Sequence, residues 1–403
     1  MRFGKAIILL FAALLPCGLL SAADTLKAPQ MALHVDGSLF FVDNEYGGNR
    51  IDGYTLPGFV LRPTVEWRLD KRVSLNGGLN WIHFWGNNGF PEGRLNEVWP
   101  AATDSTRQVN ITPWLQARVE FTPWLTMVMG SLVNEDGHGM PTPLYNSERL
   151  YASDPEAGMQ FLVDTRYLKA DMWVDWREFI WHFSPVNEVF NAGLSLTPQL
   201  PLGDRWMVSL PLHGLVQHRG GEGLSDTTLT RTNYLNASAG LAVQYTRGAF
   251  SLSAEGHAMH YSRSGGPEGV LIYDEWGCLK SEPLNYKRGW SAYGLLHVSL
   301  QEAEAALSYW TSEKFVPLMG SYLYSNVSSN TASLTFDRIE LLSASLRHTW
   351  RFASCSAVLE CSYYRVFPTT GDRKDYWKCT IDGQNLFSVG AFVKFNPTVP
   401  LVR

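Results

Sequence analysis

The chain has 403 residues, of which 33 are Lys or Arg and 38 are Asp or Glu, giving a formal net charge of -5 and a mean hydropathy of -0.12. A disordered chain would need low hydrophobicity and high charge, a coiled coil would be dominated by Ala, Glu, Lys, Leu and Arg, and a nucleic-acid binder would carry a basic excess. Because 45% of the residues are hydrophobic while the mean hydropathy is near zero, apolar residues are diluted among polar ones, which excludes a multi-span helical membrane protein.

Residues 1–23 have the pattern of a secretory signal. Arg2 and Lys5 precede an apolar run over residues 6–20, and the small residues 21–23 follow. This order predicts cleavage before Asp24 and a single mature domain over residues 24–403. Cys17 raises a lipoprotein alternative, but the preceding Pro16 fits it poorly.

Beyond the signal, apolar and polar residues alternate over runs of about ten. In residues 63–70, for example, Val65 and Trp67 lie on one face while Glu66 and Arg68 lie on the other. The same alternation recurs in residues 114–121, 159–167 and 235–245. This period of two predicts β-strands with one apolar and one polar face.

The connections alternate between short and long. Short turns fall near residues 70, 122, 168, 203, 247, 301 and 353, and longer polar stretches cover residues 44–57, 86–108, 134–156, 178–190, 219–232, 264–288, 311–338 and 368–384. They join sixteen strands and leave both chain ends on the short-turn side, which is typical of a bacterial outer-membrane barrel.

Aromatic residues separate this barrel from a soluble β-sandwich, which also has alternating strands. They gather near the short turns, as Trp67, Phe121 and Trp350 do, and near the long loops, as Phe41 and Trp85 do. Two such girdles mark the two membrane interfaces. We therefore predict an all-β, transmembrane, antiparallel up-and-down β-barrel of about 16 strands, with short periplasmic turns and long extracellular loops.

The last predicted strand, residues 385–396, resembles the assembly signal of Gram-negative outer-membrane barrels, with Ser388, Gly390, Val393 and Phe395 at the spaced positions. The departure is a tail, residues 397–403, beyond the aromatic residue. The strand count and loop rhythm also resemble those of sixteen-stranded porins, although no motif points to one named family.

The porin resemblance implies that the third long loop folds inward and narrows the pore. It implies that Glu135 and Asp136 of this loop oppose basic wall residues such as Arg118 or Arg166. The alternative is a surface turn rich in Gly and Pro.

The polar faces would line the lumen of the barrel. The candidate lumen residues are Glu66, Arg68, Arg118, Glu120, Asp164, Arg166, Asp171, Asp175 and Arg177, together with Glu135 and Asp136 of the loop. Mixed charges in a wide lumen favour a porin-like channel for passive or weakly selective diffusion of small hydrophilic solutes. Alternatively, neighbours such as Arg118 and Glu120 neutralise each other in a wet wall.

An enzymatic barrel is the less favoured alternative. Ser253, Glu255 and His257 share one inward face, but about 13 Å separates Ser253 from His257 along one strand, so this serine lies beyond the reach of that base. We predict that the protein is not an enzyme and has no catalytic residue, cofactor or metal. Another alternative is an adhesin or scaffold barrel that binds a protein or glycan through its long loops.

The predicted partners are outer-membrane lipid and small hydrophilic solutes, without nucleic acid, and a homo-oligomer is left open. Cys278 and Cys379 lie in polar stretches, where they either form a disulfide in an oxidising compartment or remain two unrelated thiols. The predicted location is the outer membrane of a Gram-negative cell.

Overall fold

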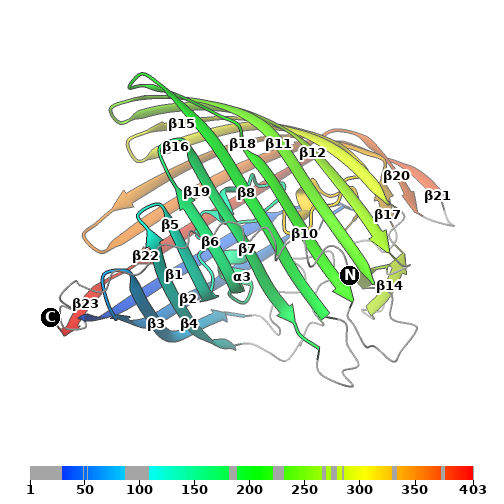
Figure 1. The fold of residues 1–403 in the computed structure, drawn as a ribbon. Helices are drawn as coiled ribbons and strands as arrows, with labels where there is room; N and C mark the ends of the chain where they lie inside the picture. The colour runs from blue at the N-terminus through cyan, green and yellow to red at the C-terminus, as the bar shows by residue number, and fades with distance from the viewer. Residues whose placement is uncertain are drawn as a thin grey trace.

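The computed structural model has one dominant sheet, which closes on itself as a barrel (Figure 1). The structure describes residues 30–48, 50–51, 53–86, 109–180, 188–220, 231–265, 269–273, 279–283, 286–328, 334–373 and 377–402. The predicted signal and Cys278 lie outside the described residues, and so does the side chain of Cys379.

The strands of the main sheet are β1 (Gln30–Glu45), β2 (Tyr54–Arg68), β3 (Val73–Phe84), β4 (Val109–Thr122), β5 (Leu125–Ser131), β6 (Ala157–Asp164), β7 (Leu168–Glu178), β8 (Glu188–Leu202), β9 (Trp206–Ser209), β10 (Leu212–Gly220), β11 (Thr232–Arg247), β12 (Phe250–Gly265), β15 (Arg288–Leu300), β16 (Ala303–Glu313), β18 (Arg338–Arg351), β19 (Cys355–Val366), β22 (Gln384–Phe395) and β23 (Thr398–Val402). Two smaller sheets contain β13 (Gly269–Tyr273) with β14 (Leu279–Pro283), and β17 (Leu334–Phe336) with β20 (Thr369–Arg373) and β21 (Trp377–Ile381).

The main sheet is a closed, sixteen-stranded, antiparallel barrel. β9 and β10 both lie between β8 and β11, so they are two halves of one interrupted strand, and β22 and β23 both pair with β1. The pairing of β1 with β22 brings the first and last strands together and removes any free sheet edge. The predicted strand count and fold class are confirmed, and the predicted tail forms β23.

The predicted rhythm of the connections is also confirmed. Short turns join β2 to β3, β4 to β5, β8 to β9, β11 to β12, β15 to β16 and β18 to β19 at the expected places. The β6–β7 turn falls at residues 165–167, slightly before its predicted position at residues 168–169. All seven turns therefore lie at one end of the barrel.

The outer wall of the barrel is apolar. Leu115, Leu241, Leu307 and Leu346 are exposed on it at mid-strand, and the aromatic residues predicted for the girdles, such as Phe41, Trp85, Trp67 and Trp350, are exposed near the strand ends. An apolar band between two aromatic girdles is the surface that a lipid bilayer requires. No described helix has the length and apolar character needed to cross a membrane.

The inner wall differs from the prediction, because part of it is apolar too. Phe40, Val42, Leu56, Ile82 and Phe84 of β1, β2 and β3 point inward and are buried. They pack against Ala152 and Tyr151 of an inward-folded loop that contains the short helix α3 (Arg149–Ala152). The lumen is therefore partly filled by a loop that packs on an apolar part of the inner wall. The alternation of apolar and polar residues does not reveal this packing.

Candidate functional site

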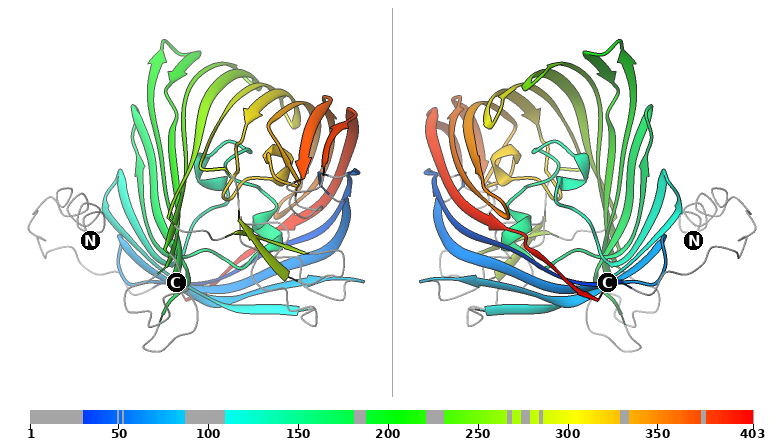
Figure 2. Two further views of the ribbon diagram at one scale, coloured as in Figure 1. Left: turned by 90° about the vertical axis from the view of Figure 1, so that its right-hand side faces the viewer. Right: turned by 90° about the vertical axis from the view of Figure 1, so that its left-hand side faces the viewer.

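Two long loops fold into the barrel. Figure 2 shows both inside the ring of strands. Loop 3, residues 132–156, carries η1 (Gly137–Gly139) and α3, and loop 7, residues 314–337, carries η2 (Tyr322–Tyr324). The predicted inward fold of the third loop is thus observed, whereas that of loop 7 was not predicted.

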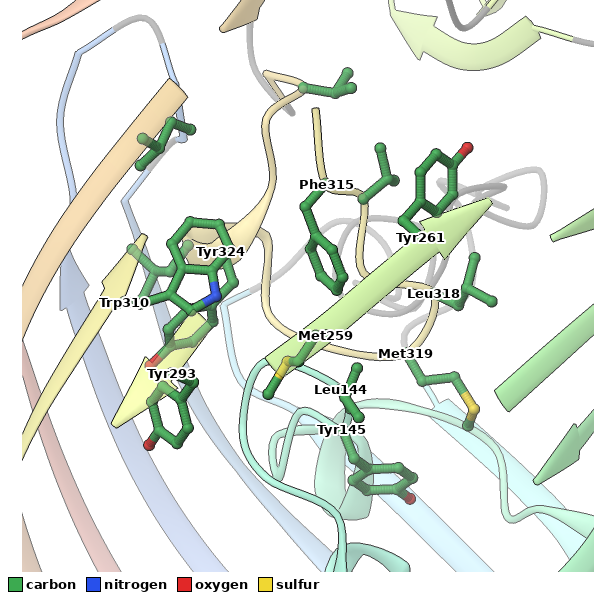
Figure 3. Packing of buried hydrophobic residues seen from close by; sticks show 14 of the residues in the cluster. Leu144, Tyr145, Met259, Tyr261, Tyr293, Trp310, Phe315, Leu318, Met319 and Tyr324 are labelled. Atoms are coloured by element: carbon green, nitrogen blue, oxygen red, sulfur yellow. The ribbon is translucent and has the colours of Figure 1, made fainter. Parts of the chain in front are cut away.

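The two loops pack on each other and on the wall in one hydrophobic cluster (Figure 3). Leu144 and Tyr145 come from loop 3, and Phe315, Leu318, Met319 and Tyr324 come from loop 7; Met259, Tyr261, Tyr293 and Trp310 belong to the wall. The backbone N–H of Asn146 donates to Met319 O over 2.8 Å, which ties one loop to the other. Asn236 of β11 donates to Val316 O over 3.0 Å and accepts from Leu318 N over 2.8 Å, which ties loop 7 to the wall.

His138 fixes loop 3 to strand β7. Its ring stacks on Trp173, with centroids 3.8 Å apart, and its two nitrogens lie 2.7 Å from Asp171 Oδ2 and 2.8 Å from Glu156 Oε2. The side chain of His138 is fully buried. Burial lowers the pKa of His138, but hydrogen bonds to Asp171 and Glu156 outweigh burial and raise the pKa to about 9.

Glu156 completes this arrangement, which we call the histidine latch (His138, Glu156, Asp171). Burial raises the pKa of Glu156, but the hydrogen bond and charge of His138 and the charge of Arg149 outweigh burial and hold the pKa below its usual range. Tyr145 also donates to Glu156 over 2.9 Å. His138 and Glu156 are fully buried and Asp171 is largely buried, and their ion pairs tie loop 3 to β7.

Most of the predicted lumen charges are paired locally. Arg68 contacts Glu66 at 3.1 Å, Arg118 contacts Glu120 at 3.5 Å, and Arg177 contacts Asp175 at 3.7 Å. Asp171 belongs to the latch, Asp164 lies at the β6 end, and Arg166 stacks on Tyr167 in the turn. Asp136 caps η1 by accepting from His138 N over 3.1 Å.

Glu135 is the loop 3 acid that faces basic groups. It lines a lumenal cavity of about 570 Å³ together with Arg62, Arg347 and Lys394, and it interacts electrostatically with Arg62 and Lys394. Arg118 and Arg166, the predicted partners, do not line this cavity. Tyrosines and serines supply much of the remaining lining, together with residues of loops 3 and 7.

Two serine–histidine pairs also face the lumen. Ser195 Oγ lies 3.1 Å from His213 Nδ1, and Ser238 Oγ lies 3.2 Å from His257 Nδ1. Glu255 Oε2 is 3.8 Å from His257 Nε2, which is longer than a hydrogen bond. From the sequence, His257 was weighed only against Ser253 of its own strand, which is out of reach; its serine neighbour, Ser238, lies across the ladder on β11.

A third polar group lies on the opposite, lipid-facing side of the wall. Asp43 of β1 and Thr55 of β2 are directly opposed in the ladder, and Thr55 Oγ1 donates to Asp43 Oδ1 over 2.6 Å. Their neighbours Val42 and Leu56 are buried inside, so alternation places Asp43 and Thr55 on the outer face. We call this pair the outward dyad.

The outward dyad lies at the long-loop end of the barrel, where the upper aromatic girdle is. Thr55 is the second residue of β2, and Asp43 is the third from the end of β1. Phe59, Trp81 and Trp85 form an adjoining aromatic cluster, with ring centroids 4.8 and 5.9 Å from Phe59. Aromatic girdles of this kind mark the boundary between lipid head groups and hydrocarbon, where polar groups cost little.

The outward dyad was not predicted from the sequence, because functional groups were expected only on the inner face. The signal was present: Asp43 and Thr55 are polar residues at positions where the alternation of their strands calls for apolar ones. A hydroxyl that donates to a carboxylate forms a nucleophile with an adjacent base. Among the described residues, no group of three or more His, Cys, Asp or Glu is arranged to hold a metal ion.

Comparisons with solved structures return barrels of low sequence identity. OmpT of Vibrio cholerae is 11% identical with a TM-score of 0.49, covering 92% of this chain and 98% of that chain. OccK2 of Pseudomonas aeruginosa, in complex with glucuronate, is 10% identical with a TM-score of 0.47, covering 94% and 99%. OccAB1 of Acinetobacter baumannii is 11% identical with a TM-score of 0.47, covering 95% and 99%. A search of curated proteins returned no match.

A sequence model of one family matches residues 23–403, nearly the whole chain. The family is described as "Lipid A 3'-O-deacylase-type". A deacylase is an enzyme, so the prediction that the protein is not an enzyme is wrong. The prediction rested on groups within one strand, such as Ser253 and His257, which lie too far apart to react together.

Proposed function

The chain belongs to the Lipid A 3'-O-deacylase-type family, and from that premise we propose that it hydrolyses an acyl ester of a lipid A-type glycolipid. We assign the reaction to the outward dyad. The observation that carries this assignment is the 2.6 Å hydrogen bond from Thr55 to Asp43 on the lipid-facing wall. A membrane lipid reaches this wall by lateral diffusion and presents its ester at the level of the head groups.

The dyad supplies the two groups that ester hydrolysis needs. Asp43 accepts the proton of Thr55 as Oγ1 attacks the ester carbonyl. The lipid alcohol then leaves with the proton held by Asp43, and the acyl group remains on Thr55. In the second half, Asp43 takes a proton from a water molecule as that water attacks the acyl-threonine carbonyl, and it returns this proton to Thr55 Oγ1 as the fatty acid leaves.

The lumenal Ser238–His257 pair is a weaker candidate for the same reaction. Its side chains face the inside of the barrel at mid-strand, and both residues are buried. Loop 7 binds Asn236, which lies on the same face of β11 as Ser238, two residues closer to the long-loop end. A membrane lipid would have to leave the bilayer to reach this pair.

The test is hydrolysis by purified protein in vesicles that contain a lipid A-type glycolipid, with released fatty acid measured by mass spectrometry. We expect Thr55→Ala and Asp43→Asn each to lower the rate at least about 100-fold, because removing the nucleophile or its base leaves only positioning effects. Ser238→Ala and His257→Ala are the matched controls and should retain the wild-type rate.

The controls separate two kinds of failure. If Ser238→Ala abolishes turnover while Thr55→Ala does not, the reaction belongs to the lumen and the assignment to the dyad is wrong. If the wild-type protein, folded by the criterion of heat-modifiable migration in gels, releases no fatty acid from any ester, the deacylase proposal itself is wrong.

Passage of small hydrophilic solutes remains a second proposed function, favoured by one observation. Glu135 lies in a mixed-charge lumenal cavity with Arg62 and Lys394. Opposed charges across a narrow aqueous space orient polar solutes and set ion preference. Binding of a protein or glycan through the long loops stays a prediction without such an observation.

Planar-bilayer recording tests this second function. Glu135→Gln should shift the reversal potential toward anion selectivity, because it removes the loop acid and leaves the wall bases. Asp136→Asn is the control, since Asp136 caps η1 and does not line the cavity. A folded barrel without conductance would contradict solute passage and leave the deacylase proposal untouched.

We propose the outer membrane as the location, in agreement with a closed barrel and with the family. Removal of residues 1–23 before assembly stays a prediction. It is tested by N-terminal sequencing of the membrane-inserted protein.

A further inference from the structure

The lipid-facing wall is not uniform, because a groove of about 560 Å³ crosses five of its strands. It is lined by outward residues of β15, β16, β18, β19 and β22, namely Leu296, Val298, Ala305, Leu307, Ala344, Leu346, Cys361, Tyr363, Phe387 and Val389. The small side chains of Ala305, Ala344 and Cys361 leave the depression between larger Leu, Tyr and Phe residues. We call this depression the outer groove.

The outer groove begins beside the outward dyad. Val389 of β22 lines the groove and lies directly opposite Asp43 of β1, which in turn lies opposite Thr55 of β2. Phe387, the other groove residue of β22, lies opposite Glu45. The groove and the dyad are therefore neighbours on one continuous face.

A single row of outward residues runs from the dyad through the whole groove. In the ladder, Asp43 pairs with Val389, Val389 with Cys361, Cys361 with Leu346, Leu346 with Ala305, and Ala305 with Val298. Each step crosses one strand spacing of about 4.8 Å.

This row descends along the barrel axis. It starts at the long-loop end, where Thr55 is the second residue of β2, and it ends near the short turns, where Val298 is the third residue from the end of β15. The descent follows from the tilt and stagger of strands in a closed barrel. The groove thus leads from head-group level into the hydrocarbon of the bilayer, which is the path of a lipid acyl chain.

We propose that the outer groove binds the acyl chain of the lipid whose ester is attacked at the outward dyad, and that it measures the length of that chain. The proposal rests on the proposed deacylase function. One leaflet holds chains about 15 Å long, half of a hydrocarbon core of about 30 Å. Starting at Thr55, such a chain spans about three strand spacings and reaches Cys361.

If the groove selects chain length, the effect of a bulky substitution should depend on its position along the row. Cys361→Phe fills the groove at the reach of a full-length chain, whereas Ala305→Phe fills it two strands further away. Ala239→Phe is a matched control, because Ala239 is an exposed, outward, mid-strand residue of β11 outside the groove.

The first readout is the ratio of kcat/KM values for long-chain and short-chain acyl esters of one head group in vesicles. We expect Cys361→Phe to lower this ratio at least about tenfold while the short-chain value stays within twofold of wild type. Ala305→Phe and Ala239→Phe should keep the wild-type ratio. An equal loss for all chain lengths, or no loss, in Cys361→Phe would overturn the length selection.

The second readout does not depend on turnover. A phospholipid with a photoactivatable diazirine on its acyl chain is placed in the vesicles, and its adducts on the barrel are located by mass spectrometry. We expect adducts to concentrate on β19 and β22 and to fall in Cys361→Phe but not in Ala239→Phe. Adducts spread evenly around the wall would overturn chain binding.

The two readouts separate the two proposals. Concentrated adducts without hydrolysis would uphold the groove as a chain-binding site and contradict the deacylase function. Hydrolysis without chain-length discrimination, together with adducts spread evenly around the wall, would uphold the deacylase function and contradict chain binding in the groove. Cys361→Leu repeats the test at the same groove position with a smaller side chain if heat-modifiable migration shows that Cys361→Phe does not fold.

Discussion

His138 shows how one buried side chain couples a loop to the barrel. Its imidazole lies between two carboxylates and is fully buried. The raised pKa of His138 corresponds to about 3 kcal/mol of stabilisation of the inward loop. An uncompensated carboxylate at this depth would cost a similar amount, so the three groups of the latch are mutually required.

The latch predicts a pH range for the closed state of loop 3. Since the folded pKa of His138 is about 9 and its ordinary value is 6.5, its contribution is complete below pH 6.5 and is lost as pH rises through 9. Since the pKa of Glu156 is lowered, its contribution is present above the ordinary value of 4.5 and is lost as pH falls below it. Loop 3 should therefore be held most firmly between pH 4.5 and 6.5.

Limited proteolysis with subtilisin checks this prediction. Cleavage within residues 132–156 should rise about tenfold or more between pH 7 and pH 10, normalised to an unfolded substrate at each pH. His138→Gln removes the titrating group, so its cleavage should be higher at pH 7 and nearly independent of pH. A wild-type loop that is equally resistant at pH 7 and pH 10 would contradict the role of the latch.

At the residue scale, the sequence predicted which face of a strand a side chain occupies better than it predicted which residues that side chain contacts. Asp171, Asp175 and Arg177 alternate along β7, and they do face inward. The histidine that binds Asp171 comes from a loop 33 residues away, and periodicity holds no information about such contacts. Glu135 was expected opposite Arg118 or Arg166, but it shares its cavity with Arg62, which reaches the cavity from the distant β2.

At the scale of elements, β23 is an addition to the expected barrel. It pairs with Met31 through His34 of β1, and His34 Nδ1 also lies 3.0 Å from Thr398 Oγ1. Pro397 interrupts the strand between β22 and β23, and its carbonyl accepts from Val35 N over 3.1 Å. The tail thus extends the seam that joins the first and last strands.

Deleting residues 397–403 should weaken this seam. Four paired positions and the side-chain contact of His34 are lost, which we expect to cost about 2–4 kcal/mol at roughly 1 kcal/mol for each net hydrogen bond. Urea unfolding of the protein in vesicles, followed by heat-modifiable migration, measures the change. Thr398→Ala is the control and should cost less than about 1 kcal/mol; an unchanged midpoint in the deletion would contradict the role of β23.

The regularly alternating strands were predicted well, whereas the irregular loops were predicted poorly. The period of two and the turn residues define sixteen strands because every strand meets the same lipid and the same neighbours. Loop 7 has no period, and its inward fold depends on Asn236, Met259 and Tyr261 of the distant wall. The interior cluster that results was therefore invisible to pattern analysis.

At the scale of the whole molecule, the barrel separates two chemical environments. Inside are a mixed-charge cavity and the buried loops; outside are the outward dyad and the outer groove. Composition analysis treated the outer face only as a lipid anchor, because apolar residues dominate its average. Asp43 and Thr55 do not alter that average. Their position beside the outer groove follows only from the pairing of the strands.

The placement of the dyad and the groove on one side of the barrel also limits how copies of the chain can assemble. The wall from β2 through β1 to β15 must face free lipid for a glycolipid to enter sideways. A ring of subunits that buried this wall would be closed to its substrate, whereas contact through the opposite wall around β5 to β8 would leave every subunit accessible from the plane of the membrane.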